Sequence, residues 1–168
     1  IENRHDTVGR IIDNPLRSPG FVAEGNRSPL WFHKRLPGYA PTPLHEVPSL
    51  ARRFAFGRVF VKDESSRLGL PAFKMLGASW ACYRALSERL GKEPAGWQTM
   101  DKLRSAFSTL TPLTLTTATD GNHGRAVARM ARFLGLSSRI FVPSNTVQPR
   151  IDAIAGEGAE VVISKGGY

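Results

Sequence analysis

The stretch Thr116-Thr-Ala-Thr-Asp-Gly-Asn-His-Gly124 separates two segments whose hydrophobic residues repeat with different periods. The segment before it, residues 113–117, is apolar and rich in β-forming residues, which predicts a strand. The apolar residues after it recur with the spacing of one helical face: Val127, Met130, Ala131 and Leu134. Asp120-Gly121 after a strand is also typical of a hairpin, but the helical period that follows favours a strand, a tight polar loop and a helix.

A loop of this kind predicts a binding site for an anion. It directs several backbone N–H groups and the positive end of a helix dipole toward one place. The alternative is structural: the side chain of Asp120 or Asn122 caps the helix and binds no ligand. The loop alone does not decide between these two interpretations.

A second motif, Gly69-Leu-Pro-Ala-Phe-Lys-Met-Leu-Gly77, places Lys74 at the start of another helix that follows a strand. Ligands of parallel sheets gather at the carboxyl ends of the strands, so we expect Lys74 and the 120–123 loop on one rim. The helix dipole and partial burial would both disfavour the charged ammonium of Lys74. Lys62 is the rival lysine, but at a strand end it is expected to pair with Asp63 or Glu64.

The motifs Phe73-Lys-Met-Leu-Gly77 and Gly121-Asn-His-Gly124 together resemble those of the fold-type II enzymes that use pyridoxal phosphate. The motif A-T-D-G-N-H-G has Asp where the dehydratases usually have Ser-Gly or similar. It is most similar to the corresponding motif of the diaminopropionate ammonia-lyases. An insertion at residues 91–112 strengthens that resemblance, which runs from about Asn14 to the end of the sequence.

The resemblance implies a role for each residue of the two motifs. The lysine of F-K-x-x-G carries pyridoxal 5'-phosphate as an imine in that family, which assigns the role to Lys74. Asn122 would hydrogen-bond the phenolic oxygen of the cofactor ring, and Asp120 would be a second catalytic base opposite Lys74. The substrate-binding residues would be Thr119, Gly121 and His123. We expect the ring of His123 to support the loop rather than to act as an acid.

The implied reaction is the α,β-elimination of the small amino acid 2,3-diaminopropionate to pyruvate and ammonia. Bases on opposite faces of the substrate would allow both enantiomers to react. One alternative is a serine or threonine dehydratase, which would differ at Asp120 and in the 91–112 insertion. The other is a non-catalytic fragment that kept the fold and lost the site. The family also implies a homodimer of the full-length enzyme in the cytoplasm.

Short apolar runs alternate with helical patterns along the chain, which predicts an α/β protein built from parallel β-α units. We expect a three-layer parallel sheet of about four strands with flanking helices. The expected strands are 58–62, 113–117, 139–143 and 160–163. The expected helices are 47–54, 74–90, 100–107, the segment after Gly124, and 147–155.

Three domain-level expectations follow from the resemblance and the sequence together. Residues 1–45 form an extended segment outside the core, although Trp31, Phe32 and Leu36 could share one side of a short helix. Residues 46–168 form the small domain of the family. The large domain that binds the cofactor phosphate is largely missing, because Gly166-Gly167 is too short a cradle. The isolated chain is therefore expected to be catalytically silent.

The composition excludes several other classes of protein. The 168 residues carry a net charge of +9, yet the basic residues are scattered. Arg125, Arg129 and Arg132 are expected on a solvated helix face, so nucleic-acid binding is disfavoured. There is no apolar run of membrane-spanning length, and no leader or metal-ligand spacing among the histidines is visible. Cys82, the single cysteine, is expected to be buried and unreactive.

Overall fold

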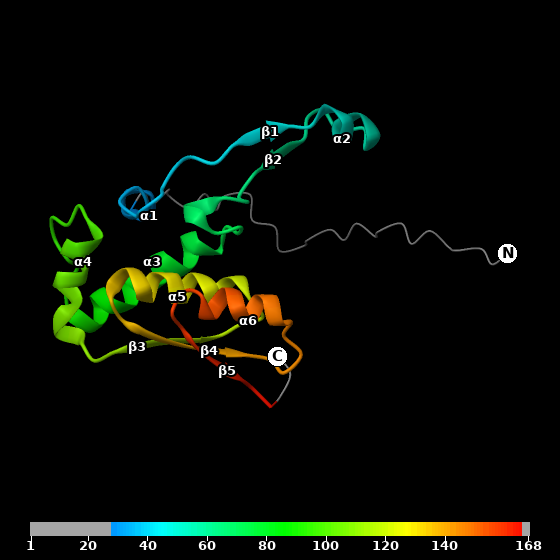
Figure 1. Cartoon of the computed structure of the whole chain (residues 1–168). Coiled ribbons are helices and arrows are strands. Elements are labelled where there is room, and N and C mark those ends of the chain that lie inside the picture. Colours follow the sequence, from blue (N-terminus) through cyan, green and yellow to red (C-terminus); the bar gives the residue numbers. More distant parts are fainter. Residues whose placement is uncertain (1–27, 166–168) are drawn as a thin grey trace, which may run out of the picture.

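Three consecutive strands form the parallel sheet of the molecule, in the order β3-β4-β5. The computed structural model describes residues 28–165. The strands are β3 (Thr114–Ala118), β4 (Ser137–Val142) and β5 (Glu160–Ile163). They are joined by the helices α5 (Asn122–Leu134) and α6 (Gln148–Ala155). Because successive strands are neighbours and such crossovers are right-handed, both helices lie on the same side of the sheet, as Figure 1 shows.

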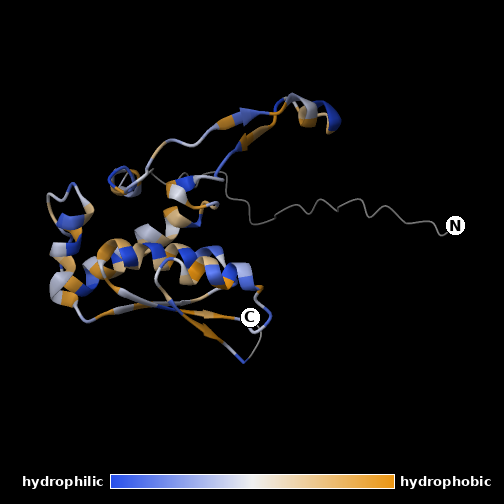
Figure 2. Cartoon of the chain, viewed as in Figure 1, coloured by the Kyte–Doolittle hydropathy of each residue, from blue (hydrophilic) through white to orange (hydrophobic). Residues whose placement is uncertain are grey.

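The burial pattern of β4 shows that helices cover only one face of this sheet. Ile140 and Val142 are buried under the helices, whereas the alternating residues Arg139 and Phe141 are exposed. Figure 2 shows hydrophobic residues along β4 and β5 despite this uncovered face. The α/β class and the parallel sheet are therefore confirmed. Within residues 28–165, however, the sheet has three strands rather than four and no helical layer on its second face.

The segment predicted as the first strand of that sheet pairs elsewhere. Phe60–Lys62 forms β2, which pairs antiparallel with β1 (Leu44–Glu46) in a separate two-stranded sheet. The short helix α2 (Pro48–Arg53) connects the two strands, and Figure 1 shows this hairpin extending away from the three-stranded sheet. The apolar run predicted a strand correctly, but its partner lies in the proline-rich segment before it, so the expected place in the parallel sheet was wrong.

The longest helix, α3 (Lys74–Leu90), packs against α5 and ends at Gly91 in the left-handed conformation, as its apolar arc predicted. The short 3₁₀ helix η1 (Arg67–Gly69) precedes it. The 91–112 insertion contains α4 (Met100–Phe107) and the 3₁₀ helix η2 (Ser108–Leu110). The hydroxyl of Thr99 caps α4 by accepting a hydrogen bond from the amide of Lys102 at 3.4 Å. None of the described helices is both long and apolar enough to cross a membrane.

The first described helix, α1 (Ser28–His33), contributes directly to the core. Phe32 is fully buried, and its ring centroid lies 4.8 Å from that of Tyr83 and 5.7 Å from that of Trp97. Leu36, just beyond the helix, is also buried. The expectation that this segment lies outside the core was therefore wrong for Phe32 and Leu36. Residues 1–27 of the expected extension lie outside the described part of the chain.

Candidate active site

A pocket of about 420 Å³ opens where the loop after β3 meets the starts of α3 and α6. All of the residues singled out from the two sequence motifs line it. One further residue, Arg150 of α6, completes its wall. The lining residues are Lys74, Thr119, Asp120, Gly121, Asn122, His123 and Arg150.

The loop between β3 and α5 is fixed by Thr119. The side chain of Thr119 is 1% exposed, and its Oγ1 accepts hydrogen bonds from the amides of Gly121 at 3.0 Å and Gly124 at 3.1 Å. The amide of Thr119 in turn donates to the carbonyl of Phe141 in β4 at 2.9 Å. Thr119 therefore holds the loop in shape, and its burial places its hydroxyl behind the loop backbone.

This arrangement argues against the alternative that Asp120 or Asn122 merely caps the helix. No side chain caps the N-terminus of α5 at its boundary residue Gly121, and the side chains of Asp120 and Asn122 are exposed at the pocket. Asp120 is 80% exposed. The capping function that could have explained these two residues is performed by Thr119 instead.

The close packing of Gly124 also shapes the loop. A Cβ atom at Gly124 would lie 2.3 Å from Cγ2 of Thr119 and 2.6 Å from Cγ2 of Ile140. No L side chain fits at such distances without displacing its neighbours. The missing side chain lets α5 begin directly against β4, which brings the helix N-terminus to the pocket.

The first two residues of α5 line this space, and their amides have no partner in the helix. Asn122 and His123 are its first two residues, and no hydrogen bond described for residues 28–165 uses the N–H of either one. Such groups carry the positive end of the helix dipole. The loop can therefore bind an anionic group with backbone amides.

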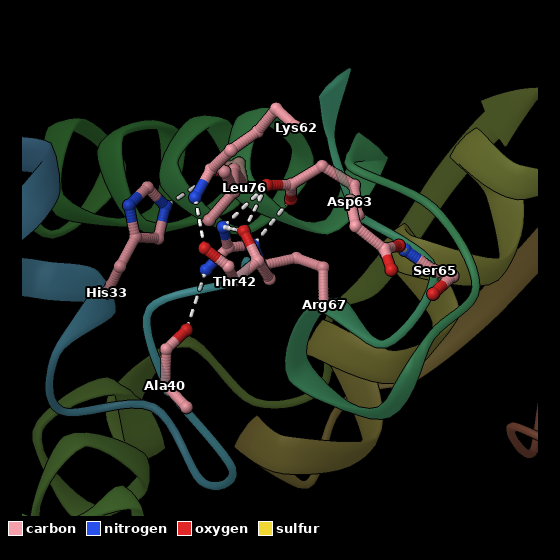
Figure 3. Close-up of polar contacts among 9 residues, drawn as sticks. His33, Ala40, Thr42, Lys62, Asp63, Ser65, Arg67 and Leu76 are labelled. Atoms are coloured by element: carbon pink, nitrogen blue, oxygen red, sulfur yellow. Dashed lines mark hydrogen bonds and ion pairs between the residues drawn. The ribbon is translucent and has the colours of Figure 1, made fainter. Parts of the chain in front are cut away.

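Lys74 is the first residue of α3, as the sequence predicted. Its Nζ lies 5.2 Å from the ring centroid of Phe73, and the side chain is exposed, so the expected partial burial was wrong for this chain. Lys62, the rival, does not line the pocket. Its Nζ donates to the carbonyl of Thr42 at 2.5 Å, rather than pairing primarily with Asp63 or Glu64 as expected (Figure 3).

The loop that leads to Lys74 is held by Arg67, which is buried (Figure 3). Its guanidinium donates to both carboxylate oxygens of Glu64, at 2.6 and 2.7 Å, and to Oγ1 of Thr42 at 2.6 Å. It also donates to the carbonyl of Ala40 at 3.0 Å. Hydrogen bonds from Arg67 lower the pKa of Glu64 to about 2. Nothing in the sequence indicates this cluster, because a Glu-x-x-Arg spacing in a loop is common on surfaces.

Three arginines of α5 surround the buried carboxylate of Glu157, so only Arg132 keeps the exposure expected of a solvated face. Glu157, 3% exposed, pairs with Arg125 at 3.1 Å, Arg129 at 2.5 Å and Arg132 at 3.0 Å. Burial raises the pKa of Glu157, but hydrogen bonds from Arg129 and Arg125 outweigh it, so the pKa lies below its usual value. Arg129 also donates to the carbonyl of Leu68 at 3.3 Å, which ties α5 to the loop before Lys74.

Arg150 is the pocket residue that the sequence did not indicate. It lies in the first turn of α6, and its Nη1 donates to the carbonyl of Asp120 at 3.0 Å. The same atom lies 3.9 Å from Oδ2 of Asp120. An arginine in the first turn of a surface helix is ordinary in a sequence, so only the fold reveals this contact.

Two other candidate groups have no place in the site. Cys82 is a half-buried free thiol whose pKa burial raises to about 11, so it is protonated at neutral pH. In the part of the chain from Ser28 to Lys165, no three His, Cys, Asp or Glu side chains lie close enough together to hold a metal ion.

Comparison with known proteins places this pocket in a family. A family model described as "Pyridoxal-phosphate dependent enzyme" matches residues 35–168. Diaminopropionate ammonia-lyase from Escherichia coli (strain K12) is 38% identical over 163 residues, which cover 97% of this chain and 40% of that protein. The crystal structure of the E. coli enzyme in apo form matches with a TM-score of 0.75 and 39% identity, covering 83% of this chain and 37% of the solved one.

A dehydratase is also similar. The biosynthetic L-threonine dehydratase of Pasteurella multocida (strain Pm70) is 31% identical over 122 residues, covering 73% of this chain and 19% of that protein. The chain thus spans 40% or less of the length of these curated relatives. Since the family model covers most of the chain, and the fold agrees with that of a solved relative, the chain belongs to the pyridoxal-phosphate-dependent enzymes.

Proposed function

We propose that the protein catalyses the α,β-elimination of 2,3-diaminopropionate to pyruvate and ammonia, and that this chain carries its attachment lysine and substrate loop. The observation that carries the proposal is the pocket itself. Lys74 at the start of α3 and Asp120 just before α5 line the same space, and so do Asn122 and His123, whose amides have no described partner within residues 28–165. The similarity to diaminopropionate ammonia-lyase supports the choice of substrate.

The residues present fit one end of pyridoxal phosphate. The exposed amine of Lys74 would react with the aldehyde, and the carboxamide of Asn122, which lines the same pocket, would hydrogen-bond the phenolic oxygen of the ring. The phosphate has no glycine-rich cradle among residues 28–165. We therefore assign the phosphate to the large domain of the family, and residues 46–168 to the small one. When bound, the cofactor supplies an electron sink for the electron pair left on the substrate Cα.

Each remaining task falls to a residue of this chain. The amides of Asn122 and His123 bind the substrate carboxylate at the positive end of α5. The amine of Lys74 removes the Cα proton from one face, and the carboxylate of Asp120 removes it from the other. Thr119 and Gly121 keep the loop in the shape that presents these groups. With the proton gone, the protonated β-amino group leaves as ammonia, and water hydrolyses the resulting 2-aminoacrylate to pyruvate and a second ammonia.

The two-base assignment is tested by Asp120→Asn in the full-length enzyme, assayed with each enantiomer of diaminopropionate. We expect one enantiomer to lose on the order of 10²-fold or more in kcat, and the other far less, because only one face loses its base. Asp101→Asn, a change at an exposed carboxylate on α4, is the matched control. Equal losses on both enantiomers would leave Asp120 with a structural role only.

The attachment lysine is tested separately, by borohydride reduction of the cofactor-loaded protein followed by peptide mapping. We expect the label on Lys74. Label on Lys62 would overturn the assignment. We do not expect it, because the ammonium of Lys62 donates a hydrogen bond to the Thr42 carbonyl.

A dehydratase acting on serine or threonine is the second candidate, favoured by the similarity to threonine dehydratase. The substrates distinguish the two, since a dehydratase releases water from a β-hydroxyl group. We further propose, from the family resemblance, that the full-length enzyme is a homodimer located in the cytoplasm. Light scattering on the purified protein would test the dimer.

A further inference from the structure

We propose that Arg150 is a positioning residue that fixes Asp120 for proton transfer while leaving its carboxylate free. The inference rests on the proposed function only in the role it gives to Asp120. The contacts that carry it lie between the first turn of α6 and the loop before α5.

The contact is made with the backbone rather than with the carboxylate. Nη1 of Arg150 donates to the main-chain carbonyl of Asp120 at 3.0 Å, which is hydrogen-bonding distance. The separation of 3.9 Å from Oδ2 is too long for a hydrogen bond. A base must keep a lone pair available for the proton it takes, so holding the residue by its carbonyl suits that function better than a bidentate pair would.

The aliphatic part of Arg150 constrains the next residue as well. A Cβ atom at Gly121 would lie 3.3 Å from Cδ of Arg150, so this side chain lies against the loop backbone. The loop is therefore held from two sides: Thr119 binds it from the β4 side, and Arg150 covers it from α6.

Competing partners for both residues are few. Asp120 is 80% exposed, and Arg150, 3.9 Å away, is the only charged group described between Ser28 and Lys165 that lies near its carboxylate. The nearest acid on α6, Asp152, instead accepts a hydrogen bond from Gln148 at 2.7 Å. The direction of the Asp120 side chain therefore depends on Arg150 more than on any other described group.

The test uses Arg150→Met and Arg150→Lys in the full-length enzyme, with Arg139→Met as a matched control. Arg139 is an exposed arginine on the uncovered sheet face, paired with Glu160 at 2.7 Å. We expect Arg150→Met to lower kcat by on the order of 10- to 100-fold for the same enantiomer that depends on Asp120, with KM little changed. Lysine should restore part of that loss, because it keeps a donor for the carbonyl.

A second measurement does not depend on activity. In the cofactor-free protein, amide hydrogen exchange at residues 121–125 should be faster in Arg150→Met than in the parent or in Arg139→Met, because the loop loses one of its two supports. The absorbance of the bound cofactor should stay unchanged, since Lys74 is untouched.

These outcomes separate the two proposals. If Asp120→Asn discriminates between the enantiomers but Arg150→Met does not, the positioning role is overturned and the proposed function stands. If neither variant discriminates but exchange at 121–125 still rises, Arg150 holds the loop and the two-base assignment fails. Unchanged exchange in Arg150→Met would overturn the positioning role by itself.

Discussion

Two loops shape the pocket, one leading to Lys74 at the start of α3 and one containing Asp120 before α5, and they are held in different ways. The loop at 119–123 is held mainly by uncharged groups, the buried hydroxyl of Thr119 and the absence of a side chain at Gly124, with Arg150 of α6 as its one charged support. The loop at 63–73 is fixed by charged side chains that reach other segments, Arg67 toward Ala40 and Arg129 from α5 toward Leu68. The 119–123 loop therefore depends mainly on close packing and one hydroxyl group, whereas the 63–73 loop depends on charged side chains that reach distant segments.

This difference predicts that different kinds of substitution will disturb the Asp120 side and the Lys74 side of the pocket. The Asp120 loop should lose its conformation when the packing at Gly124 or the hydroxyl group of Thr119 is altered. The Lys74 loop should fail when a charge is removed or neutralised, because buried charges need their partners. Leu68 adds to this contrast, since its φ of 52° is a conformation that an L residue adopts only when its surroundings impose it.

The largest effect is expected from Arg67→Met. The change leaves Glu64, whose side chain is 18% exposed, without its main partner, and removes four hydrogen bonds. We expect a loss of about 3 kcal/mol in the free energy of unfolding, at the low end for a broken buried pair. Urea unfolding measures it, with Arg58→Met at the exposed Arg58–Glu46 pair as the control. Similar losses at both sites would remove the distinction between a buried and a surface pair.

Gly124→Ala tests the packing that holds the other loop. The new methyl group would overlap Thr119 and Ile140, and forced overpacking typically costs about 1–3 kcal/mol. Gly77→Ala is the matched control, because a Cβ there meets no atom within 4 Å and alanine favours the helix. Thermal unfolding should therefore shift downward for Gly124→Ala and not for Gly77→Ala. The reverse order would contradict the close approach of α5 to β4.

Thr119→Val removes the hydroxyl but keeps the shape of the side chain. The amides of Gly121 and Gly124 then lose their acceptor, which should cost about 1–2 kcal/mol. Thr119→Ser, which keeps the oxygen, should retain most of the stability. Hydrogen exchange at the two amides provides the direct measurement, and protection that survives in the valine variant would mean that another group holds them.

Acid should loosen the Lys74 side of the pocket. Burial lowers the pKa of His33, whose Nε2 bonds the carbonyl of Leu76 at 2.8 Å in α3, and Arg67 lowers that of Glu64 to about 2. Both folded-state pKa values lie below the usual ones, 6.5 and 4.5, so the unfolded chain binds more protons. Stability should be complete above pH 6.5, fall as His33 protonates, and fall again between pH 4.5 and 2.

Urea unfolding from pH 8 to pH 3 measures this dependence, and His33→Gln should flatten its upper part only. Hydrogen exchange should show the acid effect first in residues 63–76. A stability that rises on acidification would contradict both pKa directions.

The sequence predicted the elements whose signals are local. The starts of α3 at Lys74 and of α4 at Met100, and the strand-loop-helix around Asp120, follow from periodicity over a few residues. Contacts between distant residues were not predictable. Arg150 and Asp120 are 30 residues apart, and Arg125 and Glu157 are 32 apart. An arginine that meets such a partner has the same local sequence as one that faces water.

The same limit explains the strand at 58–62. Its apolar run identified a strand, but strand pairing depends on which segment lies beside it. The partner, β1, was inconspicuous because it is short, contains a histidine and a glutamate, and lies between prolines. The entry of Phe32 into the core was missed for a related reason, since its aromatic neighbours Tyr83 and Trp97 lie far along the chain.

The strand order β3-β4-β5 has a consequence for how the chain folds. Each strand neighbours the next one in sequence, so the loops that this sheet closes are shorter than the one closed when α1 docks onto α3, and shorter loops cost less entropy to close. Docking of α1 onto α3 spans 43 residues between His33 and Leu76 and should come later. We therefore expect substitutions at Ile140 to slow refolding and those at Phe32 mainly to speed unfolding. The half of the pocket around Asp120 would then take shape before the half around Lys74.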